Sequence, residues 1–269
     1  MTRLDSSAAW KSATALVSAN RDVLVALAGV FFLLPALVDA VFMPTPQFAT
    51  GQSEQQIAQA LMAYYADSFP MLLLLSLLPM IGMLTMLVVM LDPDRPTVGH
   101  AIRRSIGAVP SYFAAQFLVG LVILPFVTVV MAALSIVLPA TLAAAMAMVM
   151  LVYPLMRAMM IGPVLAGGRD RNPIAAIRRS LAITHGNTGR MLAFIGLAMV
   201  VFFVIYGLTM MVVGVALVLT TGGETQRLLA EGISSVVLAV GYTFFVAMLA
   251  AIYRQLAGVE RRDAPSVFE

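Results

Sequence analysis

Long apolar stretches, separated by short polar ones, dominate the chain. A helix needs about 20 apolar residues to cross a bilayer, so each stretch of that length predicts a membrane span. The first ends at the Pro44-Thr45-Pro46 breaker, and Leu138-Pro139-Ala140 divides one very long run into two. We predict six spans, which cover Val23–Val41, Phe69–Leu91, two segments within Val109–Leu165, Met191–Leu219 and Ile233–Leu256.

Composition supports this interpretation. Hydrophobic residues make up 61% of the chain and charged residues 11%, whereas a soluble domain has about 45–50% and roughly 25%. The mean hydropathy of +0.98 excludes a soluble globular protein, a disordered chain and a nucleic-acid binder. The chain has no cysteine and only two histidines, His100 and His185, so we expect neither a metal nor another cofactor.

The basic residues predict the orientation of the spans. All but two of the 16 Lys and Arg residues lie before span one, between spans two and three, between spans four and five, or at the C-terminal end of span six and beyond it. The exceptions are Arg157, inside span four, and Arg227. Because Lys and Arg collect on the cytoplasmic side, both termini are expected there, in a multi-pass protein of the bacterial inner membrane.

A short motif occurs twice. The sequence AIRRS at 101–105 recurs at 176–180, each time on an amphipathic stretch before a span, and the segment around Trp10 has a similar pattern. We therefore predict an all-α polytopic membrane protein, with six transmembrane helices as three pseudo-repeated hairpins, each preceded by an amphipathic interfacial helix. The single domain would have repeat units at about 1–91, 95–168 and 171–258, and a cytoplasmic tail at 259–269.

The arginines of these stretches are candidate contacts for lipid phosphates at the headgroup level. The alternative is that they are ordinary positive-inside anchors. The candidates are Arg103, Arg104, Arg178 and Arg179.

The region from Arg157 to Asn187 resembles the membrane domain attached to glycerophosphoryl diester phosphodiesterases, and its stand-alone bacterial relatives of unknown function. His185 departs from the family pattern, in which Arg is commoner. The resemblance implies a membrane module without catalytic residues, because the phosphodiesterase chemistry of that family belongs to a separate soluble domain absent here. The matching residues are Arg157, Pro163, Pro173, Ala176, Arg179, Ser180, Thr184, Gly186 and Asn187.

No catalytic motif stands out. The chain lacks a His-Glu-x-x-His zinc motif, a Walker loop and a dinucleotide fingerprint. We therefore expect a non-enzymatic membrane module that binds lipid or supports envelope homeostasis. Its expected partners are membrane lipids, with a homodimer or another membrane protein as the open alternatives. The alternatives are a small transporter or lipid flippase that uses Arg157, and an intramembrane enzyme of unrecognised type.

Arg157 lies within the fourth span, where a charged side chain costs roughly 2.5–3.5 kcal/mol on insertion scales. Three interpretations are open: contact with an anionic lipid or substrate, a structural role on carbonyls freed by Pro154 and Pro163, or a side chain that snorkels to the interface. We predict that the guanidinium faces the bundle interior or a cytoplasm-open cleft, not the lipid chains.

Small residues recur every fourth position along the sixth span. Residues four apart lie on one helix face, and small side chains let helices approach closely in lipid. We predict that this stripe packs against span five or span one, or forms a dimer seam. Its members are Ser235, Ala239, Thr243, Ala247 and Ala251.

The charge distribution makes the topology testable. Reporter fusions after Gly51 and Gly222 are expected to report periplasmic exposure, and fusions at Gly168 and Glu269 cytoplasmic exposure. A periplasmic reporter signal at Glu269 would contradict the six-span arrangement.

Overall fold

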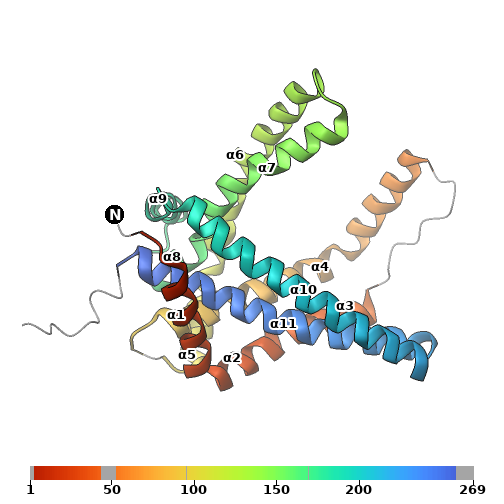
Figure 1. Ribbon diagram of the computed structural model, residues 1–269, viewed down its shortest axis with the longest axis horizontal. Coiled ribbons are helices and arrows are strands. Elements are labelled where there is room, and N and C mark those ends of the chain that lie inside the picture. Colours follow the sequence, from red (N-terminus) through yellow and green to blue (C-terminus); the bar gives the residue numbers. More distant parts are fainter. Residues whose placement is uncertain (1–2, 44–52, 95, 169, 259–269) are drawn as a thin grey trace, which may run out of the picture.

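A computed structural model describes residues 3–43, 53–94, 96–168 and 170–258 (Figure 1). The described residues form helices and no strand. The short or composite segments are α1 (Ser6–Ala19), α2 (Arg21–Ala28), the π-helix η1 (Gly29–Leu33), α3 (Leu34–Phe42), α5 (Val98–Ile106), α8 (Ile161–Gly167) and α9 (Pro173–Thr184). The long helices are α4 (Glu54–Leu91), α6 (Val109–Ser135), α7 (Ala140–Ala158), α10 (Thr188–Thr220) and α11 (Gly223–Leu256).

Six helical segments of the described chain are long and apolar enough to cross a membrane. The first joins α2, η1 and α3, and the fourth joins α7 and α8. The predicted all-α fold with six apolar helices is therefore confirmed. The six segments are Arg21–Phe42, Gln55–Leu91, Val109–Ser135, Ala140–Gly167, Thr188–Thr220 and Gly223–Leu256.

Some boundaries differ from the prediction. The polar stretch that begins at the Ser53 capping box is continuous with span two, so α4 has 38 residues and a length of roughly 57 Å. Likewise α11 begins at Gly223, ten residues before the predicted start, because nothing in the polar segment breaks the helix. The Pro44-Thr45-Pro46 breaker and the 259–269 tail lie outside the described residues.

Proline explains the irregularity of span one. Pro35 has no N–H to donate, and the preceding turns widen into η1, where the N–H of Leu34 reaches the carbonyl of Gly29. Phe31 of η1 packs on Gly82 of α4, where a Cβ would collide with the Phe31 side chain. The glycine thus lets spans one and two approach closely.

Three short helices, α1, α5 and α9, each precede a pair of spanning segments. A side-chain cap begins each of them: Asp5 for α1, Thr97 for α5 and Asn172 for α9. Helix α1 packs mainly on α11 and α5 on α4, while α9 lies against α6, α7 and α8. Each short helix therefore contacts the second span of another pair. The division into three repeated hairpin units stays a prediction.

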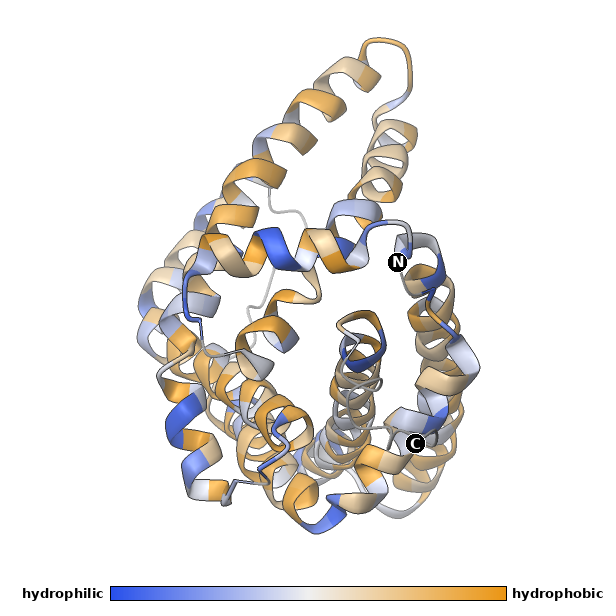
Figure 2. Cartoon of the chain, turned by 90° about the vertical axis from the view of Figure 1, so that its left-hand side faces the viewer, coloured by the Kyte–Doolittle hydropathy of each residue, from blue (hydrophilic) through white to orange (hydrophobic). Residues whose placement is uncertain are grey.

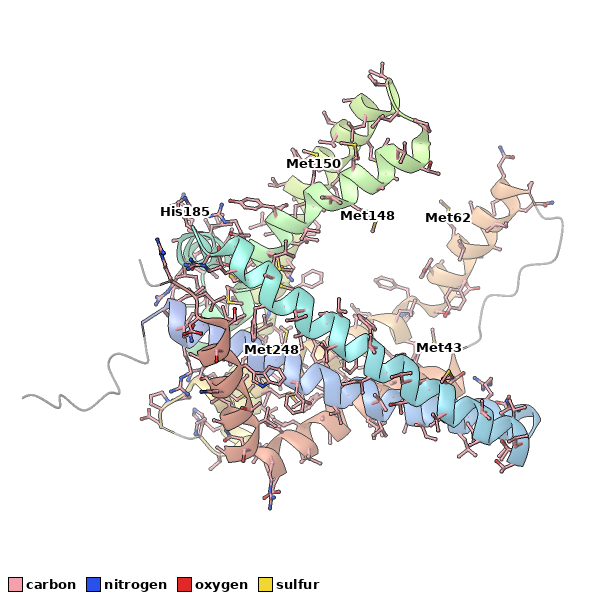
Figure 3. All side chains as sticks on the ribbon, viewed as in Figure 1. Met43, Met62, Met148, Met150, His185 and Met248 are labelled. Carbon is pink, nitrogen blue, oxygen red and sulfur yellow. The ribbon has the colours of Figure 1, made fainter. Side chains whose placement is uncertain are left out.

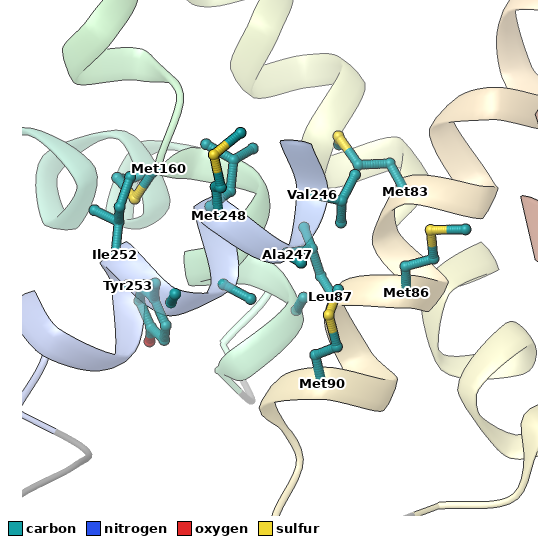
Figure 4. Close-up of a cluster of buried hydrophobic side chains, with 14 of the residues drawn as sticks. Met83, Met86, Leu87, Met90, Met160, Val246, Ala247, Met248, Ile252 and Tyr253 are labelled. Atoms are coloured by element: carbon teal, nitrogen blue, oxygen red, sulfur yellow. The ribbon is translucent and has the colours of Figure 1, made fainter. Parts of the chain in front are cut away.

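The hydrophobic core lies at one end of the molecule. It is formed by the last turns of α4, α8 and α11, and α1, α5 and α9 surround it. We call this region the basal end; it is at the left of Figure 1. Figure 4 shows Met83, Leu87 and Met90 of α4 beside Val246 and Ala247 of α11. Leu87, Val246, Ala247 and Ile252 have no exposed surface.

Away from the basal end the helices separate and expose apolar side chains. None of the most apolar window of α6 is buried, against 50% for α11. Met148 and Met150 on α7 and Met62 on α4 are exposed, whereas Met248 lies in the interior (Figure 3). An all-round apolar exposed surface of this kind suits contact with lipid chains.

The small-residue stripe of span six is largely buried. Ala247 and Ala251 are fully buried, Ala239 and Thr243 are nearly so, and Ser235 is half-buried. Helix α11 contacts both predicted neighbours, span five through α10 and span one through η1 and α3, but its most extensive contact is with α1. The basal part of α11 therefore packs against the short helix α1 and the core, a contact that the pattern of spans did not indicate.

Replacing Ala247 with Leu is expected to overpack the core and lower the free energy of unfolding by about 1–3 kcal/mol. Thermal unfolding in detergent measures the effect. Ala133→Leu on the exposed surface of α6 is the matched control and should leave the melting temperature nearly unchanged. Equal melting temperatures for the two variants would contradict the tight packing of Ala247.

Candidate functional site

Basic side chains of the described residues concentrate at the basal end. Figure 2 views the molecule from this end, and the hydrophilic ribbon lies mainly on the short helices and their flanking turns. Arg227 lies at the opposite end, where it forms ion pairs with Glu224 and Glu231 and donates to the carbonyl of Ala40. The described basic residues of the basal end are Arg3, Lys11, Arg21, Arg103, Arg104, Arg171, Arg178, Arg179, Arg190 and Arg254.

Arg104 joins three helices. Its Nη1 is 2.5 Å from Oδ2 of Asp92, at the end of α4. Its Nη2 donates to the carbonyls of Ala166 and Gly168, each at 3.1 Å, at the end of α8. Carbonyls at a helix end have no partner within the helix, and a guanidinium there satisfies them and opposes the helix dipole. Arg104 therefore holds α5, α4 and α8 together.

The other three candidate lipid contacts are placed differently. Arg103, Arg178 and Arg179 are exposed, and none has an ion pair or side-chain hydrogen bond within the described part of the chain. Arg179 occupies the same motif position as Arg104 but has none of its partners. Contact of these arginines with lipid phosphate stays a prediction. Among the described residues, the guanidiniums of Arg103, Arg178 and Arg179 have no protein partner, whereas that of Arg104 binds Asp92 and two carbonyls at the end of α8.

Arg157 connects span four with α9 through its guanidinium. Its Nη2 lies 2.5 Å from the carbonyl oxygen of Leu181 in the last turn of α9, and its Nε lies 3.5 Å from Oγ1 of Thr184. The guanidinium also lies 5.7 Å from the ring centroid of Tyr153. The side chain is partly exposed. The carbonyl that Arg157 contacts belongs to Leu181 of α9 and not to the residues near Pro154 and Pro163, and contact with an anion stays a prediction.

The same junction explains several residues of the family-like motif. The helix breaks between α7 and α8, ahead of Pro163, and the carbonyl of Arg157 accepts a hydrogen bond from Ser180 Oγ. Asn187, buried at the turn between α9 and α10, accepts a hydrogen bond on Oδ1 from the backbone N–H of Leu4 at 2.9 Å. The motif residues thus tie the second, third and first pairs of helices together.

A cavity of about 810 Å³ opens between the ends of α4 and α8 and the helix α5. Its inner wall is apolar and its rim is charged. The Asp92–Arg104 pair lies on the rim. The lining residues are Leu84, Val88, Asp92, Asp94, Pro96, Thr97, His100, Arg103, Arg104, Ser105, Ala108, Leu165, Ala166, Gly168 and Arg171.

Sequence reasoning singled out two of these rim residues, Arg103 and Arg104, and missed Asp94, His100 and Arg171. The Asp92-Pro93-Asp94 segment marked only the end of a span, and no pattern connects it with Arg171, which comes after the next two spans. Within the described ranges, no three His, Asp or Glu side chains converge as metal ligands would.

Comparison of the chain with protein-family models, curated proteins and solved structures gave no match. The resemblance to the phosphodiesterase-associated membrane domain stays a prediction.

The two copies of the AIRRS motif provide a matched pair of variants. Arg104→Gln removes the ion pair with Asp92 and the donors to α8, and is expected to lower the free energy of unfolding by about 1.5–3 kcal/mol. Arg179→Gln removes an exposed charge without a partner and should change it by less than about 0.5 kcal/mol. Denaturation of both variants in detergent distinguishes them. Equal effects would contradict the structural role of Arg104.

Proposed function

We propose that this integral membrane protein is a non-enzymatic module that binds phospholipid headgroups with the arginines of its short helices. One observation carries the proposal: α5 and α9, at the same end as the core, have exposed arginines that form no hydrogen bond or ion pair with another described residue through their side chains. Guanidinium groups at headgroup depth attract lipid phosphates, at about 1 kcal/mol for each Lys or Arg near an anionic surface.

The proposal includes an orientation. The basal end faces the cytoplasm of a bacterium and the spans cross its inner membrane, with α1, α5 and α9 at the cytoplasmic interface. The amphipathic character of α5 supports this placement, because Ala101 and Ser105 are buried while His100 and Arg103 are exposed. A wider role in envelope homeostasis would follow from the lipids bound, and the likeness to the phosphodiesterase-associated membrane domain is compatible with such a module.

The transporter or flippase alternative has less support from the geometry. It requires a guanidinium of Arg157 that is available to a substrate, whereas this group binds the carbonyl of Leu181 and lies beside Thr184.

Lipid selectivity tests the proposal. Spin-labelled phosphatidylglycerol is expected to associate more strongly than spin-labelled phosphatidylcholine with the wild-type protein in bilayers. The double variant Arg178→Gln/Arg179→Gln should weaken that preference, by roughly fivefold for each arginine at most, and added salt should weaken it in the wild type.

Arg227→Gln is the matched control, because it removes a positive charge from the opposite end and should leave the selectivity unchanged. Absence of any preference in the wild type, or an equal loss in the control, would show that the short-helix arginines do not bind headgroups.

A further inference from the structure

The cavity between α4, α5 and α8 is lined by three charged side chains that no other described residue compensates. Arg103, Arg171 and Asp94 all line it, and none has a side-chain hydrogen bond or ion pair with another described residue. The other charged pair on the rim, Asp92 and Arg104, is satisfied internally. The free charges are thus two guanidiniums and one carboxylate around a single opening.

The backbone gives Arg171 its place on this cavity. Its guanidinium reaches from the segment between α8 and α9 to the turn between α5 and α6, where it lies against Gly107. A Cβ at Gly107 would be 2.5 Å from Nη1 of Arg171 and 3.0 Å from its Cζ. Gly107 has φ −67°, which any residue adopts, so the conformation does not require glycine. The space that glycine leaves is occupied by the guanidinium.

The cavity also has an apolar side. Leu84 and Val88 of α4 and Leu165 of α8 line it, and all three belong to the core. Because these three side chains are almost completely buried, the polar and charged side chains of the lining supply most of the surface that a ligand can reach.

We propose that this cavity binds a zwitterionic phosphodiester, with the phosphate at Arg103 and Arg171 and a primary ammonium at Asp94. Arginine is well suited to phosphate because its planar donors can make paired, charge-assisted hydrogen bonds. A carboxylate beside the phosphate position favours a cation as the neighbouring group and disfavours a second anion. The ethanolamine phosphodiester has this combination of charges. The inference rests on the proposed function and names the headgroup class for one part of that surface.

Two sources share this chemistry, namely an ethanolamine phospholipid and its water-soluble ester. Titration calorimetry on the full chain in detergent compares sn-glycero-3-phosphoethanolamine with lysophosphatidylethanolamine. Tighter binding of the lysolipid identifies a membrane lipid as the ligand, and equal binding identifies the water-soluble ester. Either result supports the assignment if Arg103→Gln and Arg171→Gln weaken the binding.

Arg103→Gln and Arg171→Gln are each expected to weaken the affinity for these probes roughly tenfold or more, the size of a lost charge-assisted hydrogen bond. Arg190→Gln, which removes an exposed arginine of α10 outside the cavity lining, should leave the affinity unchanged. Both targets are exposed and without partners, so circular dichroism should show intact helices.

Two further variants test the position of Arg171 and the contact of Asp94 with the ammonium. Gly107→Ala retains every charge and displaces only the end of Arg171, so it should also lower the affinity. Asp94→Asn should weaken binding of the ethanolamine ester but not of glycerophosphoglycerol, which has the same phosphodiester and no ammonium.

Absence of saturable binding in the wild type, or unchanged affinity in Arg103→Gln and Arg171→Gln, would overturn the proposal. An equal loss for both esters in Asp94→Asn would overturn the ammonium assignment. The two proposals can also be distinguished. If the cavity variants leave the affinity unchanged while Arg178→Gln/Arg179→Gln still weakens lipid selectivity, this site is refuted and the proposed function stands.

Discussion

The architecture depends on the need to satisfy backbone carbonyls where helices end inside or near a membrane. Hydrocarbon supplies no donors, so each helix end needs a protein partner or water. Arg104 donates to the carbonyls of Ala166 and Gly168 at the end of α8, Arg157 donates to the last turn of α9, and Ser180 donates to the carbonyl of Arg157 near the break in span four. Each of these bonds joins different helices, so satisfying the backbone also fixes how the helices pack.

This constraint explains why the ordered core lies at one end. The break in span four and the three short helices lie there, and the last turns of α4, α8 and α11 bury one another. The other halves of the spans are continuous helices whose backbone bonds are internal. They expose most of their apolar side chains, and α6 and α7 project as a pair away from the other helices in Figure 1. Polar chemistry is consequently confined mostly to the basal end.

The sequence predicted the elements well and the contacts between them poorly. Span number, the turn at Pro139 and the buried stripe of α11 follow from periodicity and length, which are local properties. The early starts of α4 and α11 were missed because polar residues do not by themselves end a helix. The pairing of Arg104 with Asp92, and the place of Arg171 over Gly107, depend on how three separate helices meet. No spacing rule in one sequence encodes such a meeting.

The AIRRS motif shows how one pattern acquires two uses. In both copies Ala and Ser are buried against neighbouring helices, which sets the orientation of the short helix. The two copies differ in the helices that surround them. Helix α5 lies beside Asp92 at the end of α4 and beside carbonyls at the end of α8 that lack an intrahelical partner, so Arg104 turns inward. Helix α9 meets a junction already served by Arg157, so Arg179 has nothing to bind within the described chain and remains exposed. An arginine that its own fold does not neutralise keeps its full capacity for an external anion, and at the membrane surface the most abundant such anion is lipid phosphate.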